Sequence, residues 1–109
     1  MSGAGYRFAV VDALDAPHDG RILRLRLVSG EAPRLGRLKS RELVATSPTG
    51  RICRLSVKDF AVLGGKVRQE RFRKERQITV RVREIDQTGP VGLKWEVRAA
   101  TSREMSGGG

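Results

Sequence analysis

The fold is decided by residues 20–38, which read GRILRLRLVSGEAPRLGRL. Every second residue from 23 to 27 is leucine, and Arg24 and Arg26 lie between the leucines. This two-residue period is typical of a strand with one buried face and one wet, cationic face. A Ser-Gly pair at 29–30 and then Pro33 interrupt the pattern, and residues 35–38 resume it. We therefore expect a strand, a turn and a second short strand.

The same alternation recurs along the chain and predicts an all-β fold. Further strands are expected at residues 6–12, 42–46, 51–58, 76–83 and 91–98, with turns at 47–50 and 86–90. Short strands separated by predicted turns favour a small antiparallel barrel of six or seven strands over residues 6–98. The inward face is expected to include Leu23, Leu25, Leu55, Val80, Val82, Leu93 and Trp95.

Length and composition fit one domain in a reducing compartment. The chain has 109 residues, 5% of them aromatic, and Cys53 is its single cysteine. No apolar run approaches the roughly 18–20 residues that a membrane span needs, and the first residues lack the layout of a secretory signal. We expect a cytoplasmic protein with no membrane contact, and flexible tails at residues 1–5 and 99–109.

The charge balance points to a polyanionic partner. The chain carries 22 Lys and Arg against 12 Asp and Glu, a formal charge of +10. Such a field attracts polyanions, and the planar fork of arginine suits phosphate oxygens. The predicted nucleic-acid-binding residues are Arg24, Arg26, Arg54, Lys58, Lys66, Arg68, Arg71, Arg73, Lys74, Arg76, Arg81 and Arg83; Lys94 and Arg98 share the outward alternation. The alternative is a solvated face whose cations only protect strand edges.

Residues 66–76 form the densest basic segment. It is expected to be a long loop or a single helical turn, because only Val67 and Phe72 are available to anchor it. Phe72 could stack on a base or pin the segment to the core, and pinning is the preferred interpretation. This segment is the first choice for a polyanion contact.

Residues 20–30 and 33–38 resemble the second domain of translational GTPases such as elongation factor Tu. That β-barrel family shows a glycine before a strand, a Ser-Gly turn, an approach segment that ends in glycine, and another strand. The resemblance implies a free-standing barrel whose relatives contact RNA or partner proteins. No phosphate-binding loop of the type G-x-x-x-x-G-K-[ST] occurs, so GTP hydrolysis is not implied.

Signals of catalysis and of metal binding are weak. His18 stands alone in a predicted surface loop, and Cys53 falls on the apolar face of a strand. Asp12, Asp15 and Asp19 lack the other ligands of a calcium loop. The sequence thus predicts a non-enzymatic protein without metal or cofactor. The leading hypothesis is a barrel that binds RNA or a ribosome-like ribonucleoprotein, and the alternative is a module that docks an acidic protein.

Overall fold

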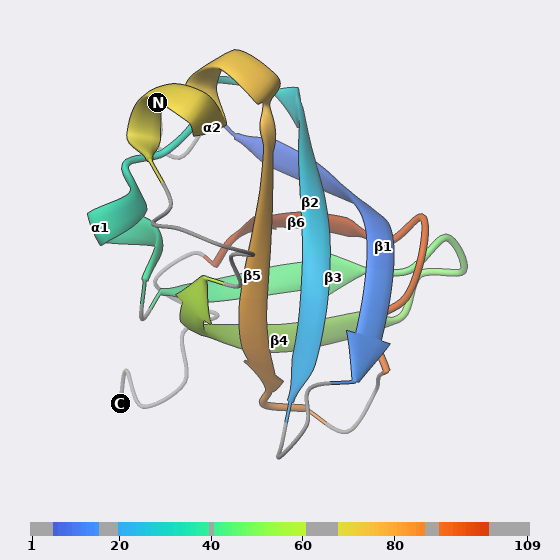
Figure 1. Cartoon of the computed structure of the whole chain (residues 1–109). Helices are drawn as coiled ribbons and strands as arrows, with labels where there is room; N and C mark the ends of the chain where they lie inside the picture. The colour runs from blue at the N-terminus through green and yellow to red at the C-terminus, as the bar shows by residue number, and fades with distance from the viewer. Residues whose placement is uncertain (1–5, 16–19, 40, 61–67, 87–89, 101–109) are drawn as a thin grey trace.

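The computed structural model describes residues 6–15, 20–39, 41–60, 68–86 and 90–100. These residues form six strands and two short helices. Figure 1 shows the strands wrapped into a barrel, with both helices at one end of it. The elements in chain order are β1 (Arg7–Asp15), β2 (Arg21–Ser29), α1 (Leu35–Leu38), β3 (Glu42–Thr46), β4 (Ile52–Phe60), α2 (Gln69–Glu75), β5 (Gln77–Glu84) and β6 (Glu96–Ala99). The predicted all-β class is confirmed.

The strands close into an antiparallel barrel in the order β1-β2-β5-β4-β3-β6. The last neighbours, β6 and β1, pair from Arg7 with Arg98 to Ala9 with Glu96, which closes the ring. Closure leaves none of these six strands with an unpaired edge, which matters for strands rich in valine and leucine. The barrel predicted from the alternation is therefore the observed architecture.

The core comes from the inward positions of every strand. Leu23, Leu25, Leu55, Val80, Val82 and Trp95, all predicted to be inward, are buried. Phe8 and Phe72 stack with their ring centroids 6.1 Å apart, so α2 closes its end of the barrel with an aromatic lid on the core. Since aromatic residues are scarce, leucine and valine fill most of the remaining interior.

Residues 35–38 are helical, so the strand predicted there is wrong. The Leu38 N–H donates to the carbonyl oxygen of Arg34, and the Lys39 N–H donates to that of Leu35. Leu35 and Leu38 are three residues apart, and on this turn they share a face toward the core. The alternation of four residues was too short to distinguish a strand from one helical turn.

Strand β6 is also shorter than predicted. Lys94 has φ 69°, in the left-handed region, and the regular ladder begins only at Glu96. The prediction that Leu93 points inward is wrong, because its side chain is 59% exposed. The barrel instead continues past residue 98, since Ala99 lies in β6 and the Ala100 N–H donates to the Glu42 carbonyl oxygen. The predicted tails, 1–5 and the rest of 99–109, lie outside the described residues.

Within the described ranges, no helix has the length and apolar character needed to cross a membrane.

Candidate nucleic-acid interface

Strands β2 and β5 bring four predicted arginines onto one outer face. Leu23 pairs with Val80 inside the barrel, so the alternate residues of both strands point outward. Arg24 lies opposite Thr79 and Arg26 opposite Gln77, while Arg81 lies opposite Ile22. Diagonal neighbours in such a ladder are about 7–8 Å apart, within reach of one polyanion. We call Arg24, Arg26, Arg81, Arg83 and the nearby Lys58 the β2–β5 cationic face.

Lys58 joins this face through an irregularity in β4. The ladder shifts between the pairs Val57–Val82 and Asp59–Arg81, which leaves Lys58 as the extra residue of a bulge. Lys58 and Asp59 are both exposed, whereas Phe60 returns toward the core. The bulge thus adds one cation to the outer surface without removing an aromatic ring from the interior.

Acidic neighbours balance only part of the β2–β5 cationic face. Asp12 lies directly across from Arg24 and Asp59 across from Arg81, but both carboxylates accept hydrogen bonds from the next backbone N–H. Arg26 lies between Ala9 and Gln77, which carry no charge. Within the described ranges, the five cations of this face form no ion pairs. Their charge is therefore available to an anionic ligand.

Helix α2 carries the second group of predicted cations. Phe72 is 2% exposed and holds the helix on the barrel, so pinning, not base stacking, is its observed role. Arg68, Arg71, Arg73, Lys74 and Arg76 are all exposed around this anchor. Only Arg71 among them has a described ion pair, at 3.0 Å to Glu75 one turn later, and both side chains are exposed. Such a surface pair contributes little and exchanges readily for a phosphate.

The helix and the strands form one continuous surface. Arg76 ends α2 in the left-handed conformation, with φ 57°, and β5 begins at the next residue. The Leu27 N–H donates to the Arg76 carbonyl oxygen at 2.7 Å, and Gln77 pairs with Arg26. The end of α2 is therefore fixed against the end of β2. Lys66, also a predicted site residue, lies outside the described residues.

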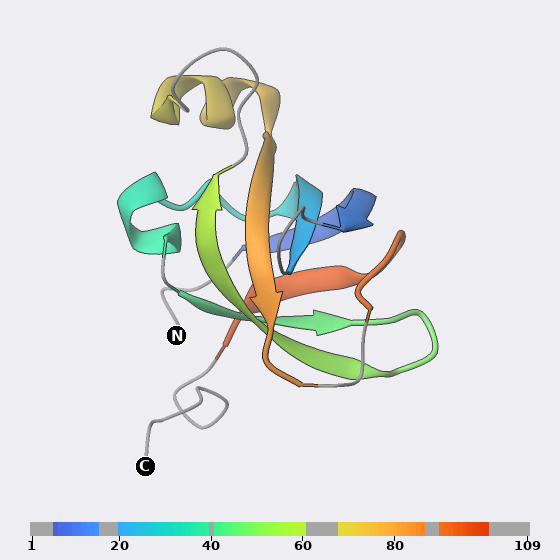
Figure 2. The same cartoon turned by 60° about the horizontal axis from the view of Figure 1, so that its bottom comes forward.

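Helix α1 adds cations that were absent from the predicted site. Gln69 of α2 accepts a hydrogen bond from the Leu35 N–H at 2.7 Å and donates to the Pro33 carbonyl oxygen at 3.0 Å. Both views of the molecule show the two helices at the same end of the barrel (Figures 1 and 2). We call α1, α2 and their flanking residues the helical cap; its exposed cations are Arg34, Arg37, Lys39, Arg68, Arg71, Arg73, Lys74 and Arg76. The Leu-x-x-Leu spacing at 35–38 is compatible with a helical turn, but four residues carry too little periodicity to assign one.

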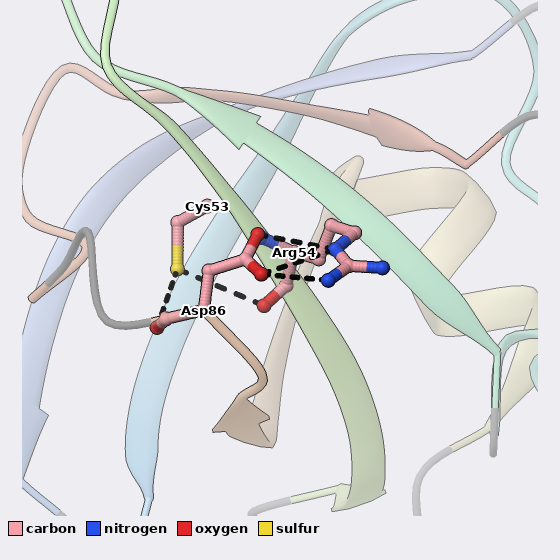
Figure 3. Close-up of polar contacts among 3 residues, drawn as sticks. All are labelled: Cys53, Arg54 and Asp86. Carbon is pink, nitrogen blue, oxygen red and sulfur yellow. Dashed lines mark hydrogen bonds and ion pairs between the residues drawn. The ribbon is translucent and has the colours of Figure 1, made fainter. Parts of the chain in front are cut away.

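Arg54, one of the predicted site residues, forms an ion pair with Asp86. Its guanidinium contacts the Asp86 carboxylate through Nη2 at 2.8 Å and through Nε at 3.1 and 3.2 Å, and its backbone N–H donates to Asp86 Oδ2 (Figure 3). These hydrogen bonds lower the pKa of Asp86 and raise that of Arg54, so the pair stays charged. The pair fastens the segment after β5 onto β4, and the guanidinium of Arg54 is occupied by a carboxylate, unlike the cations of the β2–β5 cationic face.

Several cations at the opposite end and on the β6 side of the barrel contact oxygen atoms of the protein. Arg21 donates to Asp15 Oδ1 and to the Val91 carbonyl oxygen, both at 2.7 Å, and its side chain is mostly buried. Arg7 lies 4.0 Å from Glu96 on the neighbouring β6. Arg98 donates to the Ala99 carbonyl oxygen. Among the described residues, most exposed cations without an ion pair lie on the β2–β5 cationic face and the helical cap; Arg51 and Lys94 are exposed elsewhere.

Among the described residues, the remaining candidate groups are not gathered into a second cluster. Cys53 is buried, and its thiol lies 3.6 Å from the Arg54 carbonyl oxygen and 3.7 Å from that of Asp86 (Figure 3). Within the described ranges, no three His, Cys, Asp or Glu side chains are grouped as metal ligands would be. His18 and Asp19 lie outside those ranges.

No family model, curated protein or solved structure matches the chain. The resemblance to the second domain of translational GTPases therefore stays a prediction.

Proposed function

We propose that this barrel binds RNA through backbone phosphates, with no catalytic step. The observation that carries the proposal is the continuity of exposed cations from the helical cap to the β2–β5 cationic face. Along β5 alone, the seven residues from Gln77 to Arg83 extend the surface by about 20 Å, which is six steps of roughly 3.3 Å. A stretch of that length can meet several successive phosphates of one strand, which lie about 3.4 Å apart along the axis.

The chemistry of the surface suits phosphate better than base edges. Most of its cations are arginines, whose planar fork donates two parallel hydrogen bonds to phosphate oxygens. Contacts to phosphate supply affinity and position without reading sequence. We therefore expect binding that depends steeply on salt and little on base order. The proposal includes RNA presented by a cytoplasmic ribonucleoprotein such as the ribosome, which the resemblance to translational GTPase domains implies.

One observation favours a second candidate, the docking of an acidic protein. Leu14 is 49% exposed and lies opposite Ile22, which in turn lies opposite Arg81. Apolar side chains beside a cationic face are typical of protein interfaces, whose centres contain more apolar and arginine side chains than the surrounding surface. An acidic partner would contact Leu14 and Ile22 together with the arginines of the β2–β5 cationic face.

The test compares two double variants that remove the same charge from different places. Arg26→Gln with Arg83→Gln acts on the β2–β5 cationic face, whereas Arg51→Gln with Lys94→Gln acts on exposed cations outside it. Fluorescence anisotropy with labelled RNA should give a log–log salt slope shallower by about 1.4–1.8 for the first pair, at roughly 0.7–0.9 per contact. The second pair should leave the slope near that of the parent.

Two results would overturn the proposal. Equal losses in both double variants would mean that net charge alone drives binding. Absence of RNA binding at low salt, together with a salt-resistant, ribonuclease-resistant protein recovered on the immobilised barrel and lost on Leu14→Asp, would transfer the function to protein docking.

A further inference from the structure

We infer that the RNA recognised is a double helix, held by its backbone, and not an unpaired strand. The inference rests on the proposed function and names its substrate class. It comes from the location of the aromatic rings and from the rigidity of the cationic surface.

The surface offers no aromatic platform for unpaired bases. The sequence has five Phe, Tyr and Trp residues, all within the described ranges. Tyr6, Phe8, Phe72 and Trp95 are buried, and Phe60 is half-buried against the core. Three of the buried rings contact one another: the Tyr6 ring packs edge-on against the Phe8 ring, and the Phe8 ring stacks on the Phe72 ring. Proteins that bind single strands place exposed aromatic rings beneath successive bases.

Arginine planes do not replace these rings here. A guanidinium can stack on a base, but a stacking plane works best when a second residue holds it in one orientation. Arg24, Arg26 and Arg83 are exposed and have no described ion-pair partner. Their side chains can reorient to contact phosphates, but no second residue holds a guanidinium plane in the orientation that stacking on a base needs.

The rigidity of the surface favours a rigid ligand. The β2–β5 cationic face belongs to a closed barrel, and the helical cap is fixed to it through the Arg76 carbonyl oxygen and the Gln69 side chain. A duplex carries the phosphates of two strands along one axis, so its charge density is about twice that of one strand, and it needs no ordering when it binds. A single strand loses conformational freedom when it binds, and this surface provides no stacking contacts to its bases that would offset the loss.

The test uses two RNA probes with equal numbers of phosphates. One is a duplex of about 20 base pairs, longer than the roughly 16 base pairs that known duplex-binding domains span, and the other is an unstructured CA-repeat strand of about 40 nucleotides. Anisotropy titrations of the full chain should give about tenfold tighter binding, or more, to the duplex at the same salt concentration. An affinity for the single strand equal to or greater than that for the duplex would overturn the inference while leaving RNA binding in place. Failure to bind either probe at low salt would instead remove the proposed function.

A gain-of-function variant tests the reason behind this preference. Gln77 is exposed at the start of β5, directly opposite Arg26. Gln77→Tyr introduces one aromatic ring on the outer face, where tyrosine suits a strand. This change should tighten binding to the CA-repeat strand by about tenfold and leave duplex binding almost unchanged. The matched variant Gln77→Leu, which adds apolar area without a π-face, should change neither. Equal gains from tyrosine and leucine would contradict the stacking argument.

Discussion

Leu27 donates its backbone N–H to the carbonyl oxygen of Arg76, and this 2.7 Å bond fixes the end of α2 to the strand that carries Arg24 and Arg26. Arg76 adopts the left-handed conformation in which α2 ends. A residue with a side chain is strained there, whereas glycine is not. The arginine therefore provides a cation at the junction of the helical cap and the β2–β5 cationic face, at a position where glycine would be more stable.

Arg76→Gly should weaken RNA binding without weakening the fold. The left-handed conformation costs an L-residue about 1–2 kcal/mol, part of which the more flexible unfolded chain offsets, so the free energy of unfolding should stay level or rise by up to about 1 kcal/mol. The log–log salt slope should become shallower by about 0.7–0.9, the contribution of one phosphate contact. Urea unfolding and anisotropy titrations check the two effects.

Lys94→Gly is the matched control, since Lys94 also has a positive φ, 69°, and lies outside the proposed surface. It removes the same charge and relieves the same kind of strain, so its salt slope should equal that of the parent. Identical slopes in both variants, whether parental or shallow, would contradict a local role for Arg76.

Leu25→Ala should lower the free energy of unfolding by about 2–5 kcal/mol, because it opens a cavity among fully buried side chains. Arg24→Ala, on the opposite face of the same strand, should cost less than about 0.5 kcal/mol. Urea titrations followed by circular dichroism measure both. A small loss for Leu25→Ala would contradict the inward assignment of β2.

These two residues illustrate what the sequence alone could predict. Long, regular alternation such as that of β2 identifies a strand and its inward face, because one face must meet the core over many residues. Closure of the barrel, with β5 inserted between β2 and β4, depends on long-range pairing that no local pattern encodes. The lid formed by Phe72 was foreseen only as an anchor, since its partner Phe8 is 64 residues away in the chain.

The sequence alone could predict which cations of the candidate site are exposed, but not which of them form ion pairs. The exposed cations on β2, β5 and α2 follow from alternation and composition. Arg54 shares that alternation, yet its partner Asp86 lies 32 residues away and occupies its guanidinium. The cations around α1 were missed because a turn of four residues carries too little periodicity to be assigned.

Gln69→Ala should release α1 from α2. The substitution leaves the Leu35 N–H and the Pro33 carbonyl oxygen without their side-chain partner, which should cost about 1–2 kcal/mol. Hydrogen exchange at the Leu35 amide should accelerate, and RNA binding should weaken although no charge has changed. Gln77→Ala, which removes an exposed glutamine from β5, should do neither. Unchanged exchange at Leu35 in the first variant would contradict the role of Gln69 as the clamp.

Asp86 should contribute to stability at neutral pH and lose that contribution in acid. Hydrogen bonds from Arg54 hold the pKa of Asp86 below its ordinary value of 3.8 in the folded state. The stabilisation is therefore complete above about pH 4 and is lost as the pH falls through the folded pKa. Urea unfolding of the parent and of Asp86→Asn should differ at pH about 6, and the difference should shrink as the pH is lowered below about 4. A difference that stayed constant over that range would show that the carboxylate charge is not what Arg54 recognises.

Arg71, Arg73 and Lys74 test the helical cap as a binding surface, because all three are exposed and none supports the core. Replacing the three by glutamine should make the log–log salt slope shallower by up to about 2–3, at roughly 0.7–0.9 per phosphate contact. Affinity should fall about equally for RNAs of different sequence, since phosphate contacts carry no base information. The melting temperature should stay near that of the parent, because the only described ion pair removed, Arg71 with Glu75, is exposed on the surface. A triple variant with the parental slope would mean that the cap is only a solvated charge cluster, and the β2–β5 cationic face would then have to account for RNA binding by itself.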